Sequence, residues 1–425
     1  MPSEVTAELL TRVPAAFHAG IDDVLLTGLT AAIAEWRDTR TTAGGSAILV
    51  DVEGHGRVPL SGGDDLSRTV GWFTSSYPVR LDVGSVDLSD VRVGGVAAGR
   101  VVKRVKEQLR AVPGDGLGFG MLRYLNPETA PELAALPAAQ IGFNYLGRFG
   151  AAEAPGQRAR TGWSPANDGA TGDGVGGDFP VLHALEVMGA VHDLPDGPEL
   201  MLSLAWPEAL LDESGVRALL DGWAAMLAGL VAHVSGAGGG YTPSDFPLVA
   251  LDQSRIEELE AEVPGLVDVL PVSPLQEGLL FHALFDEQGT DVYVEQMDLG
   301  LDGVVDAVAL RASWQALLDR HASLRAGFRQ LPGVDEPVQI VARQVVLPWR
   351  EGDLSHLTES EAQAEAERLG AEERAQRFDL AAPPLLKVLL VKVGENRHRM
   401  VITLHHIVLD GWSLPILMQE LWSAY

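Results

Sequence analysis

The stretch MVITLHHIVLDGWS, residues 400–413, ends a β-branched apolar run with two adjacent histidines and places Asp410 and Gly411 four residues after the second histidine. Such a run is typical of a buried strand, and Asp-Gly is typical of a turn. Because successive side chains on a strand point to opposite faces, His405 and His406 cannot both face one cleft. We expect one histidine to act as a proton acceptor at neutral pH and its neighbour to support it.

The surrounding residues predict an α/β fold for the C-terminal half. Residues 385–393 and 400–404 are apolar runs on either side of GENR, residues 394–397, which predicts a β-hairpin. Leu310, Trp314 and Leu317 recur at helical spacing and predict a helix capped near Asp306.

The N-terminal half carries the same mixture of patterns. Residues 47–53 form a short apolar run bounded by glycines, which predicts a strand. A spacing near four predicts a helix through Ile21, Leu25, Leu29, Ile33 and Trp36. We therefore expect an α/β fold here too.

A Gly/Pro/Ser-rich stretch, SGAGGGYTPSDFP at residues 235–247, separates these halves. Its composition is typical of a linker. The sequence thus predicts one unit over residues 1–235, a linker over 236–264 and a second unit over 265–425.

Composition narrows the class of protein. The 425 residues contain 31 Lys and Arg against 59 Asp and Glu, a formal charge of -28 that disfavours nucleic acid and anionic membrane surfaces as partners. There is no cysteine, so no disulfide framework or thiolate metal site is expected. The first residues do not resemble a secretory signal, and no apolar run approaches the ~20 residues that span a bilayer. We expect a soluble, cytoplasmic protein.

The second half resembles a known enzyme family at three ordered motifs. Residues 405–411 fit the His-His-x-x-x-Asp-Gly motif of nonribosomal peptide synthetase condensation domains, members of the chloramphenicol-acetyltransferase-like superfamily. SPLQEGLLFH at residues 273–282 and RHASLRAGF at 320–328 resemble the first and second motifs of that family. The resemblance implies that residues 265–425 form the N-terminal lobe of such a domain.

It also implies residue roles and a reaction. His406 would be the catalytic second histidine, His405 would pack behind it, and Asp410, followed by Gly411, would be structural with Arg325 as its partner. In that family, an acceptor amine attacks a donor thioester, and both substrates arrive on phosphopantetheine arms of carrier domains. His406 would either take the proton of the amine or stabilise the tetrahedral intermediate, and the sequence leaves both roles open.

The first half resembles synthetase epimerization domains, which share the condensation fold and invert the α-carbon of a carrier-bound residue. Four ordered motifs carry the resemblance, and it departs from the family at Val58 and Arg148. These motifs are VEGHGR at residues 52–57, RTVGWFTSSYPVRL at 68–81, GLGFG at 116–120 and FNYLGRF at 143–149. Residues 1–235 would be the C-terminal lobe of such a domain.

Glu53 is the candidate acid/base residue of this half. Removing an α-proton and returning it on the other face needs acid/base groups on both sides of the carbon. On the predicted strand, Glu53 points away from the more continuously apolar face, which favours a cleft position. The alternative is a simple loop ion pair between Glu53 and Arg57. The resemblance adds Arg57, Asn144 and Tyr145 as supporting residues, whereas His55 between two glycines is expected to be structural.

Together, the resemblances imply a slice through an epimerization–condensation junction. The epimerization N-terminal lobe would precede residue 1, and the condensation C-terminal lobe would follow residue 425. No carrier or adenylation motif occurs, so we expect no cofactor bound by this chain. Because each domain would lack its other lobe, we expect the isolated chain to be inactive. Because the epimerization unit comes first, we expect the condensation unit to take a D-configured donor. Two alternatives remain: another His-dependent acyltransferase of the same superfamily, or a non-catalytic scaffold that docks carrier domains.

Overall fold

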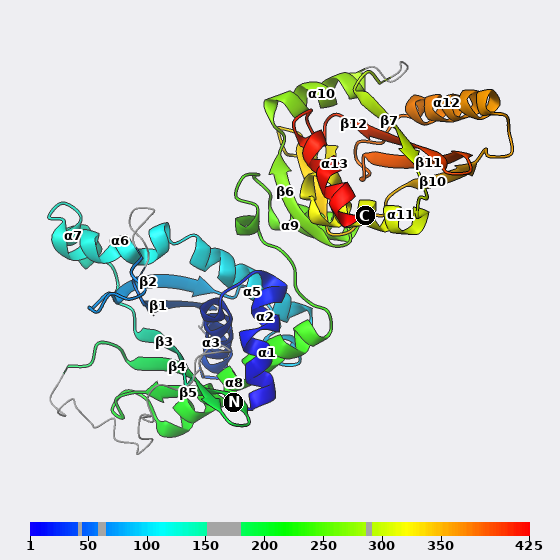
Figure 1. The fold of residues 1–425 in the computed structure, drawn as a ribbon. Coiled ribbons are helices and arrows are strands. Elements are labelled where there is room, and N and C mark those ends of the chain that lie inside the picture. Colours follow the sequence, from blue (N-terminus) through cyan, green and yellow to red (C-terminus); the bar gives the residue numbers. More distant parts are fainter. Residues whose placement is uncertain (41–44, 58–64, 151–179, 286–290) are drawn as a thin grey trace. The chain divides into compact units, whose positions relative to one another are not determined.

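The computed structural model describes residues 1–40, 45–57, 65–150, 180–285 and 291–425. The chain divides into two compact units, Met1–Ser244 and Asp245–Tyr425 (Figure 1). Each unit has its own buried core.

The first unit is built on a five-stranded sheet of order β2-β1-β3-β4-β5. The central pairs β1–β3 and β3–β4 are parallel, whereas β1–β2 and β4–β5 are antiparallel. The strands are β1 (Ala47–Gly54), β2 (Ser75–Asp82), β3 (Ile141–Phe149), β4 (Leu185–Leu194) and β5 (Gly197–Ala205).

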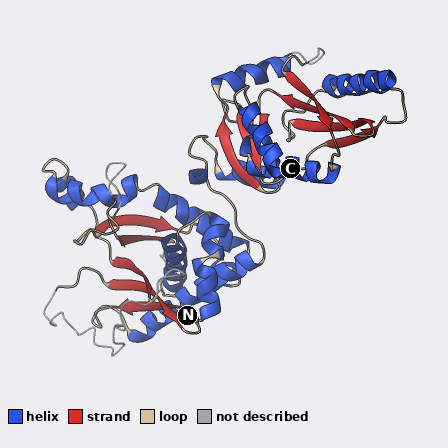
Figure 2. Ribbon diagram, in the orientation of Figure 1, coloured by secondary structure: helices blue, strands red, loops and turns tan. Residues whose placement is uncertain are grey.

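Helices cover one face of this sheet (Figure 2). On β1, Ile48, Val50 and Val52 are buried on that face, as the sequence predicts, whereas Glu53 is exposed. The helices are α1 (Ser3–Leu10), α2 (Arg12–Phe17), α3 (Ile21–Asp38), α4 (Leu88–Arg92), α5 (Val96–Arg110), α6 (Leu117–Gly120), α7 (Ala130–Ala134) and α8 (Glu213–Ser235), with short turns η1 (Pro113–Gly116) and η2 (Met121–Leu125).

Helices α3 and α8 form the centre of this core. The indole Nε1 of Trp223 on α8 donates to the Leu25 carbonyl on α3 at 3.0 Å. Gly28 lets the helices approach, because a Cβ there would lie 2.7 Å from a methyl of Leu227. The helix predicted from Ile21 to Trp36 is therefore confirmed as the buried α3.

Helix α8 has the length and apolar character of a membrane span, and so does the bent pair Ser3–Phe17 with Ile21–Asp38, contrary to the expectation from the sequence. In α8, Trp223, Met226, Leu227 and Leu230 are fully buried in the core of the unit. Burial of this kind is what the core helix of a globular unit requires.

The second unit contains two sheets: a four-stranded sheet of order β10-β11-β12-β7 and a three-stranded sheet of order β6-β9-β8. Its strands are β6 (Leu266–Pro271), β7 (Val294–Asp302), β8 (Ala326–Arg329), β9 (Val338–Ala342), β10 (Trp349–Asp353), β11 (Leu386–Gly394) and β12 (Arg397–His405). Its helices are α9 (Gln253–Glu262), α10 (Pro274–Phe285), α11 (Ala307–Arg320), α12 (Glu359–Ala375) and α13 (Ser413–Ala424), with the short turn η4 (Ala322–Arg325). The short turn η3 (Pro243–Asp245) spans the boundary between the two units.

The predicted local features of this unit are confirmed. Strands β11 and β12 pair antiparallel around the GENR turn. The Asp306 carboxylate caps α11 by accepting from the Ala309 N–H at 3.0 Å. The α/β class predicted for the whole chain is therefore confirmed.

The range predicted as a linker contains ordered structure. Helix α9 lies inside residues 236–264, with Ile256 and Leu259 buried. Tyr241 stacks on His18 with ring centroids 4.1 Å apart, which attaches the end of the glycine-rich stretch to the first unit. The glycines at 238–240 predicted a flexible linker. Burial of Ile256 and Leu259 and stacking of Tyr241 instead stabilise ordered structure, because the free energy gained by packing exceeds the conformational entropy lost.

Candidate functional site

The paired histidines end β12 in opposite environments. His405 is fully buried, whereas the His406 side chain is 32% exposed. The backbone N–H of His406 donates to the Tyr293 carbonyl at 2.9 Å, which holds the end of β12 beside the start of β7. The expected division between one accessible and one packed histidine is what the structure has.

His405 is held by the backbone and by a buried carboxylate. Its Nδ1 accepts the Ile407 N–H at 3.1 Å, so the proton of the neutral ring lies on Nε2. Nε2 lies 3.2 Å from Oδ2 of the buried Asp291, in a close contact without the alignment of a good hydrogen bond. Burial lowers the pKa of His405, and the Asp291 carboxylate opposes this only in part. His405 is therefore a neutral packing residue.

The predicted pairing of Asp410 with Arg325 is wrong. Asp410 lies at the surface and accepts from the Ser413 N–H at 2.9 Å and from the Ser413 hydroxyl at 2.7 Å, which orders the start of α13. These two bonds hold the pKa of Asp410 below its ordinary value. At Gly411, an added Cβ would meet nothing within 4 Å.

Arg325 instead serves buried backbone carbonyls. Its Nε donates to the Leu318 carbonyl at 2.9 Å, and its guanidinium also donates to the carbonyls of Ala342 and Arg343. The Leu318 carbonyl is one of the last four of α11, which have no partner within the helix, and Ala342 and Arg343 lie at the end of β9 and directly after it. The buried guanidinium therefore joins α11 to β9 and does not reach the Asp-Gly turn.

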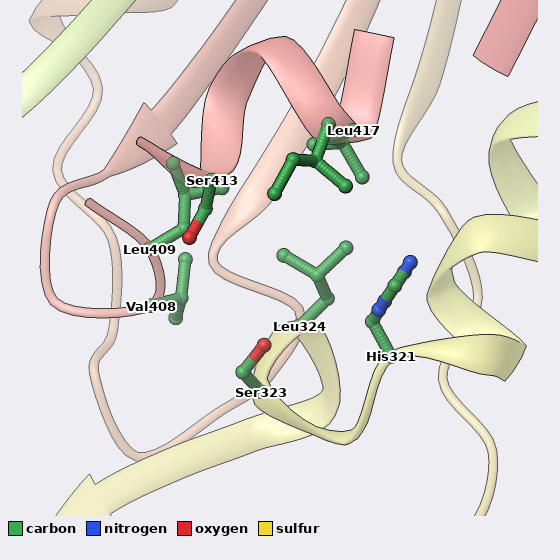
Figure 3. A pocket seen from close by; sticks show the side chains of 8 residues that line it. His321, Ser323, Leu324, Val408, Leu409, Ser413 and Leu417 are labelled. Atoms are coloured by element: carbon green, nitrogen blue, oxygen red, sulfur yellow. The ribbon is translucent and has the colours of Figure 1, made fainter. Parts of the chain in front are cut away.

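A small pocket lies beside the loop that follows His406 (Figure 3). Its volume is about 240 Å³. Three elements line it: η4, the 407–412 loop and α13, through His321, Ser323, Leu324, Val408, Leu409, Ser413, Ile416 and Leu417. The His321 Nε2 lies 2.7 Å from a carboxylate oxygen of Glu420 on α13, so this ring is engaged in holding α13.

In the first unit, Glu53 and Asn144 are brought together. They are direct partners in the parallel β1–β3 register, which places both side chains on the sheet face opposite the helices. Tyr145 follows Asn144 and points to the other face, where its ring packs against the helical core. Burial raises the pKa of Tyr145, and the Asp22 carboxylate adds to this rise.

Arg57 does not pair with Glu53. Its guanidinium donates to the carbonyls of Leu66 and Thr69 at 2.7 and 2.8 Å and lies over the Phe73 ring. His55 accepts the Arg57 N–H at 3.0 Å. Within the described part of the chain, Glu53 has no ion pair and is left accessible. Val58 lies outside the described residues.

Two further features of the first unit were not predicted from the sequence. Asp22 lies in the first turn of α3, where partial desolvation of its carboxyl and the charge of the adjacent Asp23 raise its pKa to about 6. An electrostatic perturbation of this kind leaves no motif in the sequence.

The second feature is a carboxylate–histidine–carboxylate cluster on the same face as Glu53. The His183 ring nitrogens lie 2.9 Å from Asp51 and 2.8 Å from Glu186. The ring passes over Gly142, where a Cβ would lie 2.6 Å from Nδ1. Burial lowers the pKa of His183, but the two carboxylates outweigh this and raise it above its ordinary value.

Among the described residues, no group of three or more His, Asp or Glu side chains has the arrangement of a metal site. The side chains at both candidate sites can exchange protons and form hydrogen bonds.

Comparisons with known proteins agree with the motifs. The profile of the family described as "Condensation domain" matches residues 2–236 and 267–425. A linear gramicidin synthase protein of Brevibacillus parabrevis is 37% identical over 426 residues, covering 100% of this chain and 5% of that protein. Another linear gramicidin synthase protein of the same organism is 38% identical over 431 residues, covering 100% of this chain and 8% of that protein.

Bacitracin synthase 3 of Bacillus licheniformis is 30% identical, covering 100% of this chain and 6% of that protein. Among solved structures, the epimerization domain from the third module of tyrocidine synthetase B is 28% identical with a TM-score of 0.41, over 56% of this chain and 48% of that one. The chain thus spans between 5% and 8% of the length of the synthases named here. Because the family profile matches nearly all of both units, the chain belongs to the condensation domain family.

Proposed function

We propose that residues 265–425 are the N-terminal lobe of a nonribosomal peptide synthetase condensation domain and that His406 is its catalytic residue. The observation that carries this proposal is the contrast between the accessible His406 ring and the buried His405 ring at the end of β12. A group that contacts two incoming substrates must be accessible, and of the two histidines only His406 is.

The proposed reaction forms a peptide bond between two carrier-bound substrates. The acceptor amine nitrogen bonds to the donor thioester carbon, the carbon–sulfur bond breaks, and the amine proton is transferred to the leaving thiolate. His406 would accept that proton as the nitrogen attacks and return it as the thiolate leaves. The carriers deliver both substrates on phosphopantetheine, and no cofactor is bound by this chain itself.

We propose further that residues 1–235 are the C-terminal lobe of an epimerization domain, with Glu53 as an acid/base residue. Its carboxylate is exposed, unpaired among the described residues, and beside Asn144 on an open sheet face. Glu53 would remove or return the α-proton of a carrier-bound residue on one face of the carbon. The D-configured product would then be the donor for the condensation reaction.

The remaining parts of each cleft would be lobes on a longer polypeptide. This organisation is supported by the length of the relatives, because the chain spans only a small part of each of them. Carrier domains of the same synthetase would be its partners.

A crossed pair of variants in the full synthetase tests both assignments. Glu53→Gln is expected to abolish exchange of the substrate α-proton with D₂O while leaving amide formation from a supplied D-configured donor unchanged. His406→Ala is expected to abolish amide formation while leaving exchange unchanged. Glu199→Gln and His356→Ala, both exposed and remote in sequence from the candidate residues, are the matched controls.

Two results would contradict these assignments. Carrier binding with neither reaction in the unsubstituted synthetase would favour the docking scaffold. Loss of both reactions in either variant would contradict the assignment of separate roles to the two units.

A further inference from the structure

Each of the paired histidines faces its own carboxylate from residues 291–295. His405 Nε2 lies 3.2 Å from Asp291, and His406 Nδ1 lies 3.8 Å from an oxygen of Glu295. Glu295 lies in β7, the edge strand that pairs with β12. No motif that resembles the condensation family includes Glu295 here, so the sequence alone did not single it out.

The β7–β12 register explains why Glu295 reaches His406. Glu295 is directly opposite Leu404, so the two side chains share one face of the sheet. His406 comes directly after the last residue of β12, and its Nδ1 lies 3.8 Å from the Glu295 carboxylate. Gln296 is on the other face, where it donates to the Thr403 hydroxyl at 2.9 Å. The register therefore places Glu295 next to His406 at the end of β12, whereas Gln296 points to the other face of the sheet.

The His406 Nδ1 atom is buried and has no hydrogen-bond partner among the described residues. The Glu295 carboxylate is the acidic group paired with it, with a side chain that is 51% exposed. A carboxylate only accepts hydrogen bonds, so it attracts Nδ1 when that atom carries a proton and repels its lone pair when it does not. The distance of 3.8 Å is longer than a hydrogen bond, as catalytic contacts often are before substrate binds.

We propose that Glu295 is a positioning residue that selects the Nδ1–H tautomer of His406 and so leaves the Nε2 lone pair free to accept a proton. The proposal rests on the proposed condensation function and deepens it. Of the two roles open to His406, it favours general base over initial hydrogen-bond donor, since a neutral Nδ1–H ring has no proton on Nε2 to donate. The adjacent His405 is in the opposite, Nε2–H tautomer, because its Nδ1 accepts from Ile407.

Nitrogen-15 NMR of histidine side chains in the 425-residue chain tests the tautomers without any assay of activity. At a pH where both rings are neutral, His405 is expected as Nε2–H and His406 as mainly Nδ1–H, with His406→Gln assigning the signals. Glu295→Ala is expected to shift His406 toward Nε2–H, and Glu295→Gln, which keeps an accepting oxygen, is expected to restore part of the Nδ1–H population.

Asp302→Ala is the matched control, because Asp302 is an exposed carboxylate at the far end of β7, opposite Arg397. It is expected to leave the tautomers unchanged. A His406 ring that is Nε2–H in the unsubstituted chain, or one that Glu295→Ala does not alter, would overturn the proposal.

In the full synthetase, Glu295→Ala is expected to lower kcat for amide formation about tenfold with little change in KM, a smaller loss than removal of a general base. A tautomer shift without any loss of kcat would overturn the positioning role. If His406→Ala proved fully active, the proposed function would fail while the tautomer result stood, so the two failures are distinguishable.

Discussion

At the scale of single residues, partners rather than positions decide what a motif residue does. Arg325 and Asp410 belong to two family motifs, yet Arg325 donates hydrogen bonds to buried carbonyls and Asp410 accepts them from Ser413 at the start of α13. A motif specifies residue types along the chain, whereas a hydrogen bond depends on which orphan donors and acceptors surround the side chain after folding.

A double-variant cycle tests this reassignment. Arg325→Lys keeps the charge but cannot serve three carbonyls with one fork geometry, so we expect it to lower the free energy of unfolding by about 1–3 kcal/mol. Asp410→Ala is expected to lower the free energy of unfolding by less, because only the exposed start of α13 loses hydrogen bonds, the two from Ser413. Urea denaturation of the double variant should show the sum of the two losses. A loss clearly smaller than that sum would indicate that Asp410 and Arg325 interact, as the sequence had predicted.

Some of the candidate site residues could be predicted from the sequence and others could not. His405, His406 and Glu53 were identified from their motifs, and the alternation of strand side chains predicted that the two histidines differ in environment without deciding which of them is buried. His183 and Glu295 were missed because each acts through a residue distant in sequence, Asp51 and His406 respectively, and Asp22 was missed because its raised pKa comes mainly from burial after folding.

At the scale of elements, patterning predicted α3, β1 and the β11–β12 hairpin, because burial of one face imposes a period on the sequence. It did not predict the row Asp51–Gly142–Glu186 across β1, β3 and β4, because register is a property of pairs of strands. Only Gly142 leaves room for the His183 ring over the middle strand.

The His183 cluster gives a pH-dependent stability. Because the folded-state pKa is raised, protonated His183 contributes stability that is fully present below its unfolded-state pKa of about 6.5 and is lost as pH rises through the folded-state value. Urea midpoints should show a larger deficit of His183→Gln at about pH 5.5 than at about pH 8.5. Equal deficits at both values would show that the imidazole charge is irrelevant.

Helix α8 offers a second test at this scale, using two glycines of one helix. A Cβ at Gly229 would lie 2.1 Å from the Val91 carbonyl oxygen, whereas one at Gly222 would make only ordinary contacts of 3.5 Å or more. Gly229→Ala should therefore destabilise by about 1–3 kcal/mol through displacement of α4. Gly222→Ala should be neutral or stabilise through helix propensity. Comparable denaturation midpoints for the two variants would contradict this packing.

At the scale of the whole molecule, each of the two units carries its own set of motifs and has its own buried core. The division at Ser244 falls within the range that the glycines predicted, but its position depends on contacts that composition does not reveal. Ser244 donates from its hydroxyl to Glu107 at 2.6 Å and so belongs to the first unit.

The central claim is that His406 performs the chemistry of the second unit. The most direct test is the single-turnover rate of amide formation in the full synthetase with both carriers loaded, measured beside carrier affinity. We expect His406→Ala to slow amide formation by at least about 100-fold, with carrier affinity and the His356→Ala control unchanged. An unchanged rate in the His406→Ala synthetase would contradict the claim.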